Sequence, residues 1–103
     1  MKLEILKAML EEASKDKPVT RERIKNTFLV TDRTARSMIE ELREQGVRVC
    51  GQNDIDGYWI AKTQEEYERF RRDYMSKAAT IFRRVQSMDN QTNEGQVNIF
   101  DLL

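Results

Sequence analysis

Apolar side chains recur every three or four residues at the start of the chain, the spacing of one face of an α-helix. The series predicts a first helix that ends near Asp16, before Lys17-Pro18 interrupts it. The apolar positions of this helix are Leu3, Leu6, Met9, Leu10 and Ala13.

A second, shorter helix is predicted from its cap Thr20 through Asn26, with Ile24 facing inward. The apolar run 28–30 is too short for an element and predicts a buried turn. Thr31 can cap a third helix from residue 32 to 45, which Gly46 stops. Its apolar stripe consists of Ala35, Met38, Ile39 and Leu42. Two capped helices joined by a short turn match a helix-turn-helix.

Two β-rich segments follow, residues 47–50 and 58–61, separated by the turn-rich stretch 51–57. This pattern predicts a β-hairpin. Three helices followed by a hairpin is the element order of a winged helix. The predicted fold class is therefore α+β and mostly α, a winged helix-turn-helix followed by a long helix and a flexible tail.

The long helix opens with the spacing of a capping box, Thr63 and Glu66, and meets no breaker until about Asp89. Its apolar side chains follow coiled-coil spacing. We expect its second half to form a homodimer interface through Ala78, Ile81, Phe82, Val85 and Met88. The alternative is that its first half packs against the first helix of the same chain.

Residues 89–95 have no apolar side chain. Because they can bury little apolar surface to offset the entropy cost of ordering, we expect this segment to be disordered. The last eight residues, 96–103, then include five apolar side chains. A polar tether with such an end suits a peptide ligand for another molecule. The residues expected to engage that partner are Gln96, Ile99, Phe100, Leu102 and Leu103. The competing interpretation is that they fold back onto the protein or onto a sister subunit.

The 103 residues thus predict a winged helix-turn-helix domain at 1–62, a dimerisation helix at 63–88 and a disordered tail at 89–103. Neither a membrane span nor a signal peptide is apparent, and the single cysteine fits a reducing cytoplasm. The chain has no histidine, which argues against a zinc site or a histidine-based catalytic pair. We expect no enzyme activity, no cofactor and no metal.

The net charge of zero hides a segregation of charge. Residues 18–36 hold five basic and two acidic side chains, a net of +3, whereas residues 89–103 hold three acids and no base. The body of the protein can therefore meet nucleic acid while the tail avoids it.

In a docked helix-turn-helix the second helix enters the major groove by its N-terminal end. With its apolar stripe inward, the third helix turns Arg33, Thr34, Arg36 and Ser37 outward, where they can contact base edges or phosphates. On the preceding helix Arg21, Arg23 and Lys25 can meet the DNA backbone.

The expected wing is a poor phosphate clamp, since its tip has Asp54 and Asp56 but no basic residue. Residues 52–63 approach a calcium-loop pattern, but Gln52 and Thr63 occupy ligand positions that need carboxylates. We interpret these residues as turn formers.

Several segments carry a resemblance to known families. Residues 19–60 resemble the N-terminal winged helix of biotin-protein-ligase repressors in the capped third helix, the segment Glu41–Gly46 and the Gly57-Tyr58 pair. Beyond Gly57-Tyr58 the chain continues into a helix with an acidic start and many arginines, from Glu65-Glu66-Tyr67 to Arg83-Arg84. In this respect residues 1–88 are still more similar to small helix-turn-helix proteins of phages and prophages of Gram-positive bacteria. That resemblance implies DNA binding in a bacterial host cytoplasm.

The terminal segment Gln96-x-x-Ile99-Phe100 resembles the peptide by which bacterial replication and repair proteins dock on the DNA polymerase sliding clamp. The resemblance implies that glutamine bonds to the rim of a pocket while the apolar pair fills it.

Our leading hypothesis is a non-enzymatic phage or prophage protein that binds double-stranded DNA as a dimer and docks on the host sliding clamp through its tail. A second hypothesis is a plain winged-helix transcriptional regulator. A third is a phage inhibitor that binds a host protein without contacting DNA.

Overall fold

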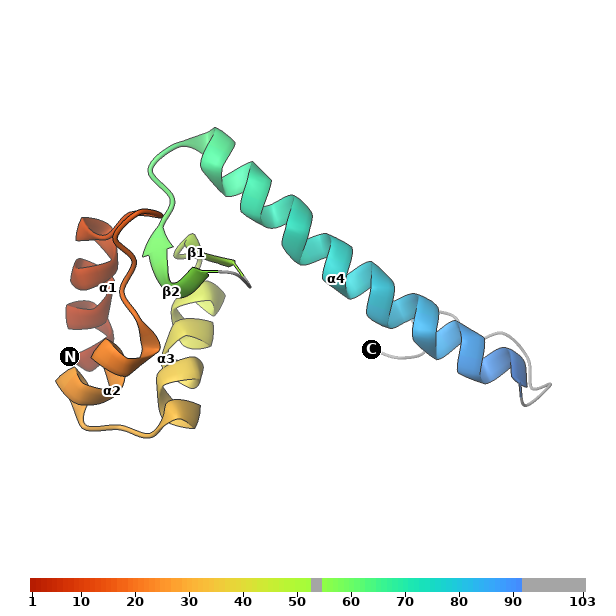
Figure 1. Ribbon diagram of the computed structural model, residues 1–103, viewed down its shortest axis with the longest axis horizontal. Helices are drawn as coiled ribbons and strands as arrows, with labels where there is room; N and C mark the ends of the chain where they lie inside the picture. Colours follow the sequence, from red (N-terminus) through yellow and green to blue (C-terminus); the bar gives the residue numbers. More distant parts are fainter. Residues whose placement is uncertain (53–54, 92–103) are drawn as a thin grey trace. The chain divides into compact units, whose positions relative to one another are not determined.

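The computed structural model describes residues 1–52 and 55–91 and has an α+β, mostly helical fold (Figure 1). The elements are α1 (Lys2–Glu12), α2 (Arg21–Phe28), α3 (Asp32–Glu44), β1 (Val49–Gln52), β2 (Ile55–Ile60) and α4 (Gln64–Gln91). Residues Met1–Phe70 form one compact unit, and a second unit begins at Arg71, within α4. The compact unit therefore includes the first two turns of α4, beyond the boundary at residue 62 that the sequence predicts.

The core of the first unit comes from the apolar stripes that the sequence predicts. Ile24 of α2 is fully buried, and so are Leu6 and Leu10 of α1. The stripe of α3 is buried as expected, and the core is completed by Ala13, Val19, Val49, Cys50 and Trp59. These side chains hold three helices against one hairpin, and burial of their apolar surface is the main stabilising term.

Helix α1 ends at Glu12, four residues before the predicted end near Asp16. Ser14 and Lys17 close a tight turn instead, since each backbone N–H donates to the other's carbonyl at 3.1 Å. The local hydrogen bonds of this turn replace the last helical turn that periodicity alone suggested.

The connection between α2 and α3 differs from the buried turn that the sequence predicts. Phe28 is the last residue of α2, and Leu29 is 90% exposed in the left-handed conformation with φ 53°. The amide of Val30 still donates to the carbonyl of Lys25 at 3.1 Å. A left-handed residue at this position closes the helix end, and its side chain points to solvent. The prediction of a buried turn was wrong at Leu29.

The hairpin is antiparallel, and its strands reach nearer the tip than predicted: β1 begins only at Val49 and continues to Gln52, and β2 runs from Ile55 to Ile60. Cys50 pairs with Trp59, and a register shift follows Gly51. A further bridge joins Tyr58 to Val19, in the segment between α1 and α2. This bridge ties the hairpin to the helices.

The start of α4 is fastened to the hairpin. Thr63 caps the helix by accepting from the Glu66 N–H at 3.1 Å, but the Glu66 carboxylate accepts from Trp59 Nε1 instead of returning to the cap. Only half of the predicted capping box therefore forms. The helix ends at Gln91, so the first three residues of the predicted tail, 89–91, are helical.

Candidate nucleic-acid interface

Two threonine caps fix the first turns of α2 and α3. Thr20 Oγ1 accepts from the Arg23 N–H at 3.1 Å, and Thr31 Oγ1 accepts from the Thr34 N–H at 3.2 Å. Both caps are those that the sequence predicts. Each satisfies a backbone donor that the helix itself leaves unpaired, so the side chains of these first turns start from well-defined positions.

Helix α3 separates its two faces as the spacing requires. Its four apolar stripe residues are at most 7% exposed, whereas its candidate DNA-contacting side chains are exposed: Arg33, Thr34, Arg36 and Ser37. In Figure 1 the loop that leads into α3 lies at the end of this unit opposite the start of α4. Within this unit, the first turn of α3 therefore lies away from the first residues of α4.

The basic side chains of α2 and of the first two turns of α3 fall into two groups. Arg21 Nη1 and Arg36 Nε lie 3.5 Å and 3.3 Å from the same oxygen, Asp32 Oδ2. Lys25 Nζ lies 3.4 Å from Glu22 Oε2. Within the described ranges, 1–52 and 55–91, the side chains of Arg23 and Arg33 form no ion pair.

The later turns of α3 are acidic on their outer face. Glu40, Glu41 and Glu44 are exposed and would repel phosphates. Contact with nucleic acid is therefore limited to the first two turns of the helix, which is the geometry of end-on insertion.

The basic residues at the base of the hairpin already have internal roles. Arg48 Nη1 donates to Gln64 Oε1 at 2.7 Å, and its guanidinium lies 4.0 Å from the centroid of the Tyr67 ring. Lys62 Nζ donates to the Glu11 carbonyl at 3.0 Å. Asp56 is exposed, while Asp54 lies outside the described residues. The hairpin thus offers little positive charge to a phosphate.

The second unit presents apolar side chains along α4. Ile81 is 59% exposed and Met88 is 63% exposed, and Ala78 is also exposed, whereas Phe82 and Val85 are half-buried. The opposite side of the helix is polar and internally bonded, since the hydroxyls of Thr80 and Ser87 donate to the carbonyls of Ser76 and Arg83. The part of α4 in this unit is therefore amphipathic, with one apolar face and one polar face.

Cys50 is buried in the core. Desolvation raises the pKa of its thiol to about 11, with a smaller contribution from the nearby Glu66 carboxylate. The thiol is therefore protonated near neutral pH and is a packing residue in an apolar setting. Among the residues that the structure describes, no cluster of His, Cys, Asp and Glu is arranged to hold a metal ion. None of the described helices is long and apolar enough to cross a membrane.

Sequence reasoning named the basic residues of this face but missed the role of Asp32. The spacing of Asp32 and Arg36, i to i+4 on one helix, is a signal for their ion pair. The link to Arg21 depends on how α2 packs against α3, so no local pattern could have indicated it.

The candidate partner peptide, residues 96–103, lies outside the described residues, and the hypotheses about it still rest on the sequence. No protein-family model, no curated protein and no solved structure matches this chain.

Proposed function

We propose that this chain is a non-enzymatic DNA-binding protein of a phage or prophage, with a winged helix-turn-helix in residues 1–70. The observation that carries the proposal is the exposed first turn of α3. Arg33 is solvent-exposed and has no ionic partner among the described residues, next to the exposed hydroxyl side chains of Thr34 and Ser37. Arginine can bond in a bidentate manner to guanine, and hydroxyls bond to bases or phosphates.

In this proposal α3 reads the major groove and α2 meets the sugar–phosphate backbone through Arg21, Arg23 and Lys25. The hairpin plays little part in phosphate binding, because it carries Asp56 while its flanking base Arg48 is held by Gln64. A single unit of this kind would bind weakly. We therefore include dimerisation through the apolar residues of α4, since two half-sites multiply affinity.

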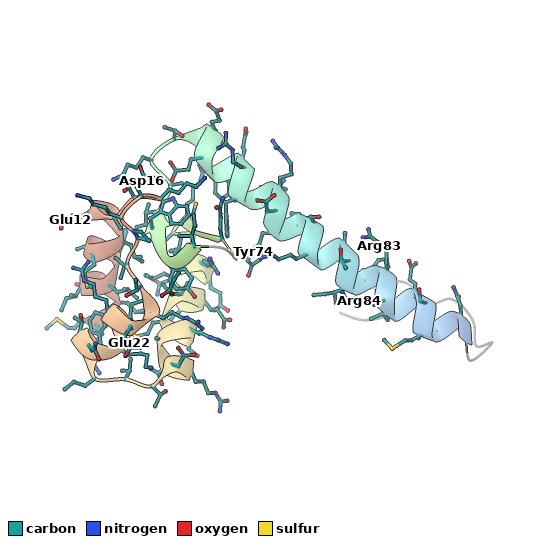
Figure 2. The ribbon with its side chains drawn as sticks, viewed as in Figure 1. Glu12, Asp16, Glu22, Tyr74, Arg83 and Arg84 are labelled. Carbon is teal, nitrogen blue, oxygen red and sulfur yellow. The ribbon has the colours of Figure 1, made fainter. Side chains whose placement is uncertain are left out.

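The test is the binding of duplex DNA by Arg33→Ala combined with Arg36→Ala. Removal of the proposed base contact of Arg33 and of the positive charge of Arg36 should weaken binding roughly tenfold or more. The measurement is a fluorescence-anisotropy titration of labelled duplex at several salt concentrations. A matched control is Arg83→Ala combined with Arg84→Ala, which removes the same charge from α4 (Figure 2).

Equal losses in the two double variants would mean that bulk charge, and not the face of α3, drives binding. No binding by the unaltered chain would favour the alternative of an inhibitor that docks on a host protein. The observation that favours this alternative is that the hairpin carries the acidic Asp56 and offers little positive charge to DNA.

We further propose that the tail docks on the bacterial sliding clamp, on the strength of the sequence Gln96-x-x-Ile99-Phe100. Purified clamp should be retained by the full chain, and retention should disappear for a chain that ends at Gly95. A full-length variant with Ile99→Ala and Phe100→Ala should behave like the shortened chain. Retention by all three forms would contradict the proposal. Retention by none would leave the protein as a plain winged-helix regulator, the second alternative.

A further inference from the structure

Asp32 lies between two of the arginines that the proposed function assigns to DNA. One of its carboxylate oxygens, Oδ2, is 3.5 Å from Arg21 Nη1 and 3.3 Å from Arg36 Nε. Arg21 begins α2 and Arg36 lies in the second turn of α3, so this one oxygen joins the two helices. The side chains of Arg21, Asp32 and Arg36 are 37%, 46% and 59% exposed. Both pairs are therefore open to exchange with a ligand.

We propose that Asp32 is an internal competitor of DNA phosphates, which restrains binding that is independent of sequence. This inference rests on the proposed function. Guanidinium groups bind carboxylate and phosphate oxygens through the same fork of N–H donors. While Asp32 occupies donors of Arg21 and Arg36, a phosphate must displace it, and its negative charge repels the phosphate that arrives.

Arg33 differs from Arg21 and Arg36, and this difference indicates what competition by Asp32 would achieve. The guanidinium of Arg33 has no such partner in the part of the chain that the structure describes, so it is available for a base edge. Asp32 therefore weakens the electrostatic contribution to binding without touching the base contact of Arg33. Exposed ion pairs contribute little to stability, so breaking the pairs of Asp32 with Arg21 and Arg36 in a DNA complex costs little free energy.

The test compares Asp32→Asn with two controls that change the net charge equally, Glu22→Gln and Asp16→Asn. Glu22 lies on α2 and pairs with Lys25, whereas Asp16 follows α1, away from the α2–α3 loop (Figure 2). The probe is a labelled duplex of arbitrary sequence, titrated by anisotropy from low to physiological salt. Circular dichroism checks that each variant is folded.

We expect Asp32→Asn to bind the duplex roughly fivefold or more tighter than the unaltered chain. The slope of log affinity against log salt should steepen by about 1 to 2, since each freed arginine can add one phosphate contact. Glu22→Gln frees one lysine and should give a smaller gain. Asp16→Asn should change affinity less than twofold. The gain from Asp32→Asn should vanish when Arg21→Ala and Arg36→Ala are added.

The inference would be overturned if Asp32→Asn bound DNA no tighter than Asp16→Asn. It would also be overturned if the gain in affinity persisted after Arg21 and Arg36 were both replaced by alanine. Weaker binding by Asp32→Asn would also overturn it, because Asp32 would then be a structural residue of α3 or a direct reader of cytosine. If neither the unaltered chain nor any variant binds duplex DNA, both the proposed function and this inference are rejected. Binding by the unaltered chain without a response to Asp32→Asn rejects the inference alone.

Discussion

Gly57→Ala is expected to destabilise the protein by about 3 kcal/mol or more, from backbone strain together with steric overlap. Gly57 has φ 141°, a conformation that L-residues rarely adopt. A Cβ at this position would lie 2.7 Å from the Val19 carbonyl oxygen and 2.8 Å from Pro18 Cβ. Neither of these atoms is at the end of a flexible side chain, so the overlap cannot be relieved cheaply.

The neighbouring hydrogen bonds explain why the chain comes so close there. The Val19 N–H donates to the Tyr58 carbonyl at 2.8 Å, and the Tyr58 N–H donates to the Val19 carbonyl at 2.9 Å. Val19 is fully buried. Moving the backbone away to accommodate a methyl group would break this pair of bonds and leave buried polar groups unpaired, which is costly.

Gly46→Ala is the matched control. Gly46 also has a positive φ, 91°, but a Cβ added there would meet nothing within 4 Å. Only the backbone strain remains, so the expected loss is about 1 kcal/mol. Urea unfolding followed by the fluorescence of the single tryptophan measures both variants. Equal losses at the two glycines would show that the contact with Val19 does not matter.

Local chemistry made part of this fold predictable. The caps Thr20 and Thr31, the stripe of α3 and the stop at Gly46 all follow from signals within a few residues, and the structure has each of them. Apolar spacing likewise indicated the buried faces of α1 and α2. These features form because short-range hydrogen bonds and periodic burial point to the same conformation.

Other features do not follow from apolar spacing. Leu29 takes a left-handed conformation and an exposed position, although an apolar run suggested burial. The hydrogen bond of Glu66 depends on tertiary packing, because its carboxylate accepts from Trp59 Nε1 and not from the backbone N–H of the helix cap. The same holds for the candidate site, where the link from Arg21 to Asp32 exists only because α2 packs on α3. Spacing along one helix could suggest only the Asp32–Arg36 half of that network.

Trp59→Ala is expected to cost about 3 to 5 kcal/mol, the usual range for removal of a buried aromatic side chain. Trp59 is 3% exposed and lies opposite Cys50 in the hairpin. Its indole N–H donates to Glu66, which fastens the first two turns of α4 to the hairpin. The substitution therefore opens a cavity in the core and releases one anchor of α4.

Two further variants and a hydrogen-exchange measurement separate these effects. Trp59→Phe keeps most of the ring but removes the donor, so its cost should be about 1 to 2 kcal/mol. Glu66→Gln keeps an acceptor for the indole and should cost less than either tryptophan variant. Hydrogen exchange should show faster exchange in residues 64–70 for both tryptophan variants, because the weakened anchor allows this part of α4 to open locally. A loss below about 1 kcal/mol for Trp59→Ala would contradict the central place of this residue. Unchanged exchange at 64–70 would mean that the contacts of Arg48 with Tyr67 and of Arg43 with Phe70 hold α4 by themselves.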